Sequence, residues 1–130
     1  MPCSFDPDVV SFGSYTEVCP GGGSGYGARL NYSETHYAII TYIDSIRRTF
    51  VYDDEKAFAA KLCKAKALDS DVTFGIAVYD VDYDDYENKC ASLNRYNRNS
   101  RLKAVKRVVE SFRRQSMIFD ENICRKTAVP

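Results

Sequence analysis

An acidic stretch between residues 80 and 87 holds the side chains of this sequence that could act most directly in chemistry. Its members are Asp80, Asp82, Asp84, Asp85 and Glu87. On an extended strand the even-numbered acids share one face. Two carboxylates could therefore be paired for acid–base chemistry, or several could bind a calcium ion. The EF-hand pattern fails, because the stretch has no glycine at the turn position and no glutamate at the twelfth position.

Five cysteines are a high number for 130 residues and indicate either disulfides or a metal site. They lie far apart, no Cys-x-x-Cys pair occurs, and His36 is the only histidine. Zinc sites usually need clustered Cys and His ligands, so we predict disulfides and expect neither a metal nor another cofactor. The odd count leaves one thiol, which either stays free or pairs with a second chain. The cysteines are Cys3, Cys19, Cys63, Cys90 and Cys124.

Disulfides indicate an extracellular or lumenal protein, and we expect the chain to be secreted. Asn31-Tyr32-Ser33 is a glycosylation sequon that would be used in that setting, with Asn31 as the acceptor. No signal peptide follows Met1-Pro2, and we expect that an expression start replaced a leader.

The segment from Arg95 to Arg114 is basic, with eight Lys and Arg residues against the single acid Glu110. Such a cluster could bind a sulfated glycan. We favour the alternative, in which it is the solvated face of an amphipathic helix, partly balanced by the acidic stretch. The candidate ligand-binding arginines are Arg95, Arg98, Arg101, Arg107 and Arg114.

The overall composition is that of a globular protein with 45% hydrophobic residues and a formal net charge of zero. No global field therefore attracts nucleic acid or an anionic membrane. No apolar run approaches the roughly 18 residues that a membrane span needs. We expect one domain over residues 1–130, with no nucleic-acid partner and no membrane span.

The first half of the chain predicts strands followed by a helix. A strand-like run extends over residues 9–19, and a glycine-rich loop covers residues 20–27. Residues 37–43 and 48–52 predict a β-hairpin. The acids at residues 53–55 then begin a helix that runs to about residue 67. Its buried stripe would consist of Phe58, Leu62 and Ala65.

The second half predicts one strand and one helix. Residues 74–81 are nearly continuous in apolar side chains, as in a strand covered on both faces. Ser100 can cap a second helix in which apolar residues recur at helical spacing. The tail is irregular unless a disulfide holds it. The apolar positions of the second helix are Leu102, Val105, Val109 and Phe112.

Three segments, in order, carry a likeness to a known family. Residues 12–19 are similar to its "(F)xxYYEIC" stretch, residues 50–54 to "WVGYDD", and residues 75–86 to its last barrel strand, "GAMVWxLDxDDF". The chain thus resembles the C-terminal quarter of glycoside hydrolase family 18, the chitinases and chitinase-like lectins. The resemblance covers residues 9–112, and the tail 113–130 matches nothing in it.

This resemblance implies a disulfide pairing. In the family, the cysteine of the first motif bonds the cysteine after the last strand, which carries over to Cys19 and Cys90. Of the pairings left, we favour Cys63 with Cys124, which would tie the tail to the first helix, and Cys3 stays unassigned. The resemblance also implies that the acidic stretch ends the last strand and caps its connection. We favour this role over ion binding, and ion binding over catalysis.

The catalytic motif of the family is missing. Glycoside hydrolysis needs a proton donor, which in the family is the glutamate of a DxxDxDxE motif, and no such motif occurs in this chain. Tyr79 stands where the family has a tryptophan under the central sugar, and the smaller ring offers less stacking area. We expect no catalytic residue and no enzyme activity. Tyr79, Asp80 and Asp82 are kept as candidate ligand-binding residues.

A complete TIM barrel needs eight strands, and the resemblance accounts for one. We therefore predict an α+β domain that is not a barrel. Its short, mostly antiparallel sheet would contain the hairpin and one long strand, with two helices packed on one face and disulfides as braces. Exposed sheet edges would also allow a homodimer.

The expected function is that of a secreted, non-enzymatic chitinase-like effector. It would bind a secreted or cell-surface protein and modulate immunity. By family-level analogy, we expect small relatives among the salivary proteins of blood-feeding arthropods. Ten tyrosines and no tryptophan fit a tyrosine-rich binding face. The alternative is a lectin-like domain that binds a glycan or a glycosaminoglycan.

Overall fold

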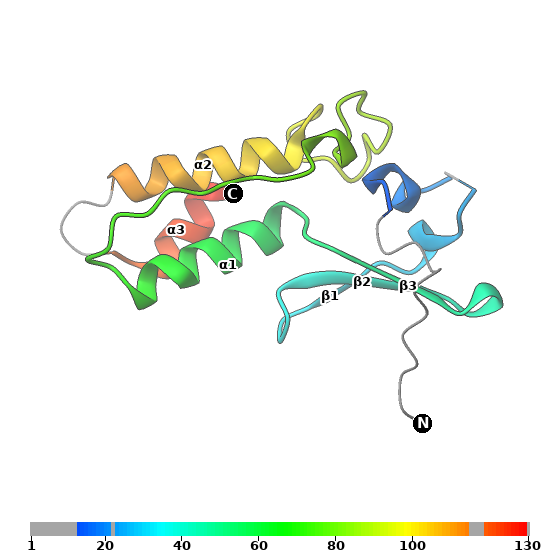
Figure 1. Ribbon diagram of the computed structural model, residues 1–130, viewed down its shortest axis with the longest axis horizontal. Coiled ribbons are helices and arrows are strands. Elements are labelled where there is room, and N and C mark those ends of the chain that lie inside the picture. Colours follow the sequence, from blue (N-terminus) through cyan, green and yellow to red (C-terminus); the bar gives the residue numbers. More distant parts are fainter. Residues whose placement is uncertain (1–12, 22, 115–118, 130) are drawn as a thin grey trace.

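The computed structural model describes residues 13–21, 23–114 and 119–129, and its fold is α+β (Figure 1). A three-stranded antiparallel sheet lies at one end of the molecule and three α-helices lie at the other. The described chain forms no barrel. The predicted fold class, an α+β domain with a short antiparallel sheet and bracing disulfides, is confirmed.

The sheet is built around the predicted hairpin. Strands β2 (Ala38–Ile43) and β3 (Arg48–Tyr52) pair antiparallel, with Ile40 opposite Val51. Their β-branched and aromatic side chains suit a pleated, half-buried surface. The third strand, β1 (Asn31–Ser33), pairs with β2, so the strand order is β1-β2-β3.

The strand predicted for residues 74–81 is wrong. Residues 72–80 have no regular secondary structure, and Val81–Tyr83 form a short 3-10 helix. Instead of joining the sheet, this segment runs beside the helices (Figure 1). A β-prone sequence becomes a strand only where a neighbouring strand offers it backbone hydrogen bonds. The third strand of the sheet is β1 instead.

The strand-like run predicted for residues 9–19 is also wrong where the structure describes it, and residues 9–12 lie outside the described residues. Tyr15–Val18 form a 3-10 helix. Ser14 and Glu17 close it as a capping box, in which the backbone N–H of Ser14 donates to the Glu17 carboxylate at 2.9 Å. Such reciprocal caps stabilise a helical turn over an extended chain.

Three helices form the other end of the molecule. Helices α1 (Glu55–Leu68) and α2 (Ser100–Arg114) are the two predicted ones, and α3 (Glu121–Ala128) forms in the tail. Asp54 and Asp120 cap α1 and α3 through their carboxylates. The helices pack chiefly against one another, which differs from the predicted pair over one face of the sheet.

Small residues form the core of this bundle. Short side chains allow the helices to approach closely, and the predicted stripe on α1 is therefore only partly correct. Phe58 and Leu62 are half-buried, and Ala65 is exposed. On α2, Val105 is buried as predicted, whereas Leu102 is exposed. The buried core residues of the bundle are Ala59, Cys63, Val108, Cys124 and Ala128.

Both predicted disulfides are present. Cys19–Cys90 lies in the core beside the sheet, packed with Tyr15, Val18 and Tyr26. Cys63–Cys124 joins α1 to α3 and thereby holds the tail against the bundle. Cys3 lies outside the described residues.

Removing the second disulfide should destabilise the fold strongly. It closes a separation of 61 residues, and the chain-entropy model gives about 4 kcal/mol for such a loop. We expect the double substitution Cys63→Ala and Cys124→Ala to lower the free energy of urea unfolding by about that amount. Ser45→Ala with Ser92→Ala, at two exposed positions, is the control and should change this free energy by less than about 0.5 kcal/mol. An unchanged unfolding midpoint in the double variant would contradict the disulfide's structural role.

Candidate functional site

The chain between α1 and the loop that precedes α2 carries an unusual amount of exposed hydrophobic surface. We define residues 72–83 as the exposed segment. Figure 1 shows it running back alongside α2. Tyr79 is 83% exposed. Hydrophobic side chains gathered on a surface often mark interaction sites in soluble proteins. The exposed hydrophobic side chains of the segment are Val72, Phe74, Val78, Tyr79, Val81 and Tyr83.

Two clefts open along this segment. The first, of about 220 Å³, brings three of the predicted ligand-binding residues together, because Tyr79, Asp80 and Arg101 all line it. Its apolar wall includes Leu102 of α2. The second cleft, of about 370 Å³, lies at the other end of the segment, beside Phe74. Both clefts combine apolar walls with a few charged groups, as binding sites commonly do.

The beginning of the exposed segment is fastened to α1 by one lysine. The Lys66 ammonium donates hydrogen bonds to the carbonyl oxygens of Ser70 at 2.5 Å and Val72 at 2.7 Å. It also lies 5.7 Å from the ring centre of Phe74. Phe74 in turn contacts Phe112 of α2 edge to face, with the ring centres 5.7 Å apart. These contacts hold the segment beside the helices.

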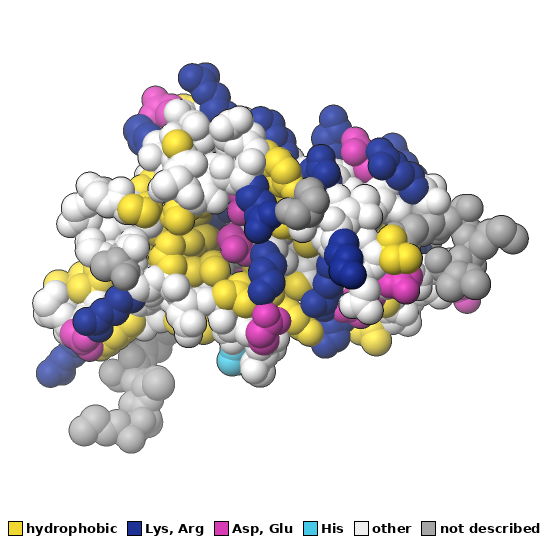
Figure 2. Space-filling model, turned by 180° about the vertical axis from the view of Figure 1, so that it is seen from behind, with side chains coloured by type: hydrophobic (Ala, Val, Ile, Leu, Met, Phe, Trp, Pro, Cys, Tyr) yellow, Lys and Arg dark blue, Asp and Glu magenta, His cyan; other side chains and the backbone are white. Residues whose placement is uncertain are grey.

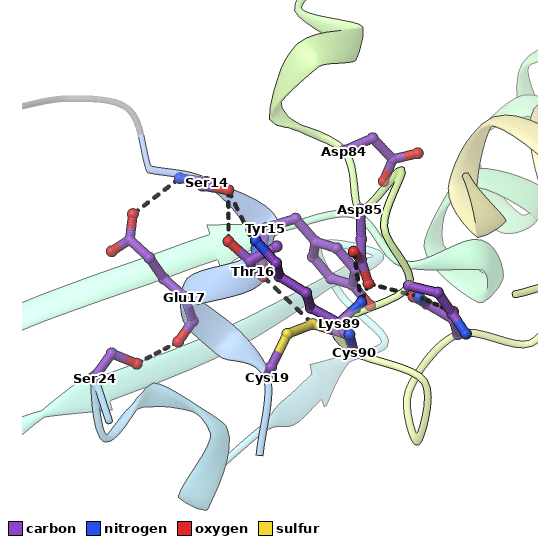
Figure 3. The surroundings of a disulfide bond; sticks show 12 residues. Ser14, Tyr15, Thr16, Glu17, Cys19, Ser24, Asp84, Asp85, Lys89 and Cys90 are labelled. Carbon is purple, nitrogen blue, oxygen red and sulfur yellow. Dashed lines mark hydrogen bonds between the residues drawn. A yellow bond between two sulfur atoms is a disulfide. The ribbon is translucent and has the colours of Figure 1, made fainter. Parts of the chain in front are cut away.

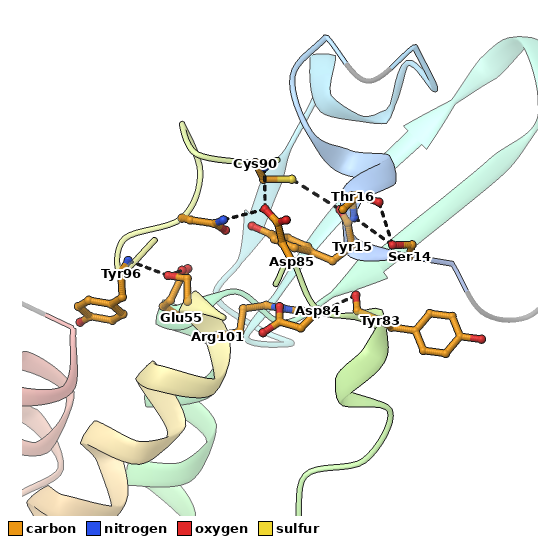
Figure 4. A network of polar contacts seen from close by, with 12 residues as sticks. Ser14, Tyr15, Thr16, Glu55, Tyr83, Asp84, Asp85, Cys90, Tyr96 and Arg101 are labelled. Atoms are coloured by element: carbon orange, nitrogen blue, oxygen red, sulfur yellow. Dashed lines mark hydrogen bonds and ion pairs between the residues drawn. The ribbon is translucent and has the colours of Figure 1, made fainter. Parts of the chain in front are cut away.

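The end of the segment is fastened by Arg101. Its Nε donates to the Asp84 carboxylate at 2.7 Å, and its guanidinium lies over the Tyr15 ring at 4.3 Å. Figure 4 shows this stack between α2 and the N-terminal 3-10 helix. Because both members of the ion pair are largely buried, solvent screens this ion pair less than a surface one. Arg101 is therefore a structural anchor as well as a wall of the first cleft.

A buried carboxylate joins the first turns of α1 and α2. Glu55 is 3% exposed and accepts a hydrogen bond from the Ser100 hydroxyl and another from the backbone N–H of Arg95 at 3.2 Å (Figure 4). Ser100 also accepts from the backbone N–H of Tyr96 at 2.8 Å. Sequence reasoning placed Glu55 only as a favourable charge at a helix start, and its partners 40 and 45 residues away give no local signal.

Asp85 organises the loop that carries Cys90 (Figure 3). Its carboxylate accepts hydrogen bonds from the backbone N–H groups of Lys89 at 2.8 Å and Cys90 at 2.7 Å, and from the Asn94 amide at 2.8 Å. Burial alone would raise the pKa of Asp85, but these hydrogen bonds together lower it below its usual value. The acidic stretch was predicted to end the last strand and cap its connection; no strand directly precedes it in the described chain, and Asp85 instead caps the loop that carries Cys90.

The remaining acids of the stretch have different surroundings. Asp84 is buried in its ion pair with Arg101. Asp80 lines the first cleft with a left-handed backbone conformation, φ 54°. Asp82 is exposed in the 3-10 helix and does not line that cleft. The stretch therefore does not gather its carboxylates around one point.

One group of potential metal ligands occurs among the described residues. Ligand atoms of Cys19, Asp85 and Cys90 lie within 4.8 Å of one another. The two sulfur atoms are bonded to each other, so neither is a thiolate that could bind a metal ion. The Asp85 oxygens are already occupied by the donors of the loop. This cluster is a braced loop and offers no metal centre in the oxidised protein.

The predicted basic residues do not share one surface. Arg107 lies over the Tyr96 ring and donates to the carbonyl oxygen of Ala128 at 3.2 Å. Arg98 and Arg114 are exposed, and neither lines a described cleft with the other arginines. Arg95 lines a separate cleft of about 280 Å³. The other charged residues that line this cleft are Lys56, Arg125 and Lys126.

This basic cleft lies towards the α3 side of the molecule, which Figure 2 shows from behind. Lys and Arg side chains gather over the middle of that face, with acidic side chains among them. Lys56 pairs with Glu34 at 2.9 Å, and Arg125 pairs with Glu121. The cluster is thus partly neutralised. The sequon residue Asn31 is exposed at the start of β1.

Comparison with family models, with characterised proteins and with solved structures finds no match to this chain. The resemblance to glycoside hydrolase family 18 therefore stays a prediction. In the described part of the chain, no helix is long and apolar enough to cross a membrane.

Substituting Asp85 by asparagine tests the capping of the Cys90 loop. Asparagine keeps the shape but turns an amide N–H₂ toward a backbone N–H, and an unsatisfied buried donor costs about 1–3 kcal/mol. We expect Asp85→Asn to lower the free energy of urea unfolding at pH 7 by that amount. Asp82→Asn, at an exposed position, is the matched control and should change it by less than about 0.5 kcal/mol.

The same variant makes a prediction about pH. The folded-state pKa of Asp85 lies below the ordinary value of 3.8, so its charge stabilises the fold fully above that value. The contribution is lost as the pH falls from 3.8 through the lower folded-state pKa. The stability difference between wild type and Asp85→Asn should therefore shrink between pH 5 and pH 2. A constant difference over this range would contradict the charged cap.

Proposed function

We propose that this protein is a secreted, non-enzymatic chitinase-like effector that binds a host or partner protein through the exposed segment. The row of hydrophobic side chains on residues 72–83, held at both ends but covered by no other described element, carries this proposal. Burying such a row against a partner would remove apolar surface from water, which is the main driving force of association. A modulatory action on host immunity follows the family resemblance.

Secretion is supported by the two buried disulfides, which persist in oxidising compartments. The exposed sequon at Asn31 fits the same setting. Neither observation depends on the family resemblance.

The absence of catalysis is supported by the way the carboxylates are used. A glycosidase needs one accessible carboxylic acid with a raised pKa and a second group across the scissile bond. Burial raises the pKa of Asp54, but its carboxylate accepts the N–H of Ala57 as the cap of α1. Asp84 and Asp85 are held by Arg101 and by the Cys90 loop. None of these three is placed to serve as a proton donor.

Partner capture tests the binding surface. Immobilised wild-type protein is incubated with serum or an immune secretome, and retained proteins are quantified by mass spectrometry. The double variant Val78→Ser and Tyr79→Ser removes two exposed side chains, each worth about 1–2 kcal/mol when buried. We expect at least a tenfold loss of the retained partner. Val51→Ser with Tyr42→Ser, two exposed positions on the sheet, is the matched control. Equal capture by both double variants would overturn the proposed surface.

Turnover of a fluorogenic chitobiose substrate tests the non-enzymatic part of the proposal. We expect a rate equal to that of buffer, because the DxxDxDxE motif is missing from the sequence and the carboxylates of Asp54, Asp84 and Asp85 are engaged in structural contacts. A rate that persists after repurification and disappears in a single Asp or Glu variant would show that the protein is an enzyme.

A further inference from the structure

We propose that the exposed segment is a docking strand: residues 73–79 pair edge to edge with an extended peptide of the partner that has an apolar, β-prone core and basic residues on both sides of it. This inference rests on the proposed binding function and specifies the chemistry of the partner. Strand addition of this kind obtains affinity from backbone hydrogen bonds and specificity from alternate side chains.

The backbone of the segment is available for pairing. No N–H or C=O group of residues 73–79 forms a hydrogen bond with another described residue. The same residues have the composition of a strand, with Phe74, Ile76 and Val78 alternating with smaller or polar neighbours. None of residues 72–79 has a positive φ. No residue of the segment therefore has to leave a left-handed backbone conformation before a neighbouring strand can pair with it.

The segment is also held in place before a partner arrives. Lys66 fixes its first residues through the carbonyl oxygens of Ser70 and Val72, and Arg101 fixes its end through Asp84 and the carbonyl oxygen of Tyr83. Between these anchors the chain runs nearly straight along α2 (Figure 1). Chain entropy has thus been lost in the free protein, so the cost of ordering on binding is reduced.

Acidic residues flank the segment on both sides. Asp69 and Asp71 precede the proposed docking residues 73–79, and Asp80 and Asp82 follow them. All four are exposed, and none forms an ion pair with another described residue. A peptide that lies along residues 73–79 would place its own ends beside these carboxylates. Charge complementarity therefore favours lysine or arginine at both ends of the partner strand.

The same charges argue against a second copy of this chain as the occupant. In an antiparallel pair of two copies centred on Ile76, Asp71 of one copy lies beside Asp80 and Asp82 of the other. In a parallel in-register pair, each acid lies beside its own equivalent. Like charges in neighbouring positions destabilise paired strands.

The two clefts give the partner strand places for its side chains. The first is lined by Phe58, Leu102 and Val105, and the second by Val109 and Phe112. They lie near the two ends of the segment, beside Val78 and Phe74. Apolar side chains near both ends of the partner strand's core would fit into these two clefts. The partner strand is therefore expected to have an apolar core.

Synthetic peptides test the proposal on the full-length oxidised protein. Three fluorescent peptides share a seven-residue core of alternating valine and threonine. The lysine peptide has two lysines at each end, and the glutamate peptide has two glutamates at each end. The proline peptide has the same lysines and a proline at the centre of the core. Anisotropy titration at low salt should give at least about tenfold tighter binding of the lysine peptide than of the other two. Amide hydrogen exchange should slow at residues 73–79 when the lysine peptide is bound.

A charge-reversal variant makes the test specific. In Asp71→Lys with Asp82→Lys, two exposed flanks change sign, and the preference should switch to the glutamate peptide. Arg98→Glu with Arg114→Glu, far along the chain from the segment, is the control and should keep the wild-type preference. Equal binding of all three peptides, or no protection of residues 73–79, would overturn the docking strand. If capture of the partner is still lost in the Val78→Ser and Tyr79→Ser variant, the proposed binding function would remain supported.

Self-association is the remaining outcome to distinguish. Sedimentation of the free protein over a hundredfold concentration range should show a monomer. A dimer whose formation slows exchange at residues 73–79 would identify a second copy as the occupant and overturn the proposal.

Discussion

The buried carboxylate of Glu55 is the constraint on which the arrangement of sheet and helices depends. Moving a carboxylate out of water is costly unless donors surround it. The Ser100 hydroxyl, at the start of α2, and the Arg95 N–H, in the loop before it, supply those donors. Glu55 follows strand β3 after only two residues. One buried group therefore fixes the first turns of two helices and the exit of the sheet together.

The exposed segment is a consequence of that junction. Glu55, the stack of Arg101 on Tyr15 and the two disulfides already join sheet, loop and bundle. The chain between α1 and the Cys90 loop has only to span the distance along α2. It is held at Lys66 and Arg101, and its side chains add little to either core. Stability is thus concentrated in elements that do not include it, which leaves its surface free for binding.

The elements that the sequence predicts correctly are those set by local pattern. The hairpin has β-branched runs on both sides of a polar turn, and Asp54 caps α1 where acids precede a helical run. The capping box of Ser14 and Glu17 is also visible in the sequence, and it identifies the first helical turn better than the apolar run around it. The pairing of Cys19 with Cys90 followed from the resemblance and not from local pattern.

Most of the other errors come from dependence on distant partners. Helix α3 has eight residues, too few to be stable alone, and it exists because Cys124 and Ala128 pack in the bundle. Among three neighbouring acids, Asp53 pairs with Lys61, Asp54 caps a helix and Glu55 is buried. Of the three, only Glu55 depends on distant residues, because its donors are the Ser100 hydroxyl and the Arg95 N–H. Helix packing likewise decides which cleft each predicted ligand-binding residue lines. One cleft is lined by Tyr79, Asp80 and Arg101, and a separate one by Arg95.

An exposed β-prone segment with unpaired backbone is ordinarily a liability, because copies of the same chain can pair through it and aggregate. Here residues 73–79 lie between acids on both sides, and both the antiparallel pairing centred on Ile76 and the parallel in-register pairing of two copies bring those acids together. Replacing the flanking acids by neutral residues would lengthen the apolar run. It would then strengthen pairing with a second copy of the chain as much as pairing with the partner peptide. Acidic flanks instead destabilise pairing with a second copy, whose flanks are also acidic, and stabilise pairing with a partner whose flanks are basic. Negative charge at Asp69, Asp71, Asp80 and Asp82 thus protects the free protein and selects its ligand by the same electrostatic interaction.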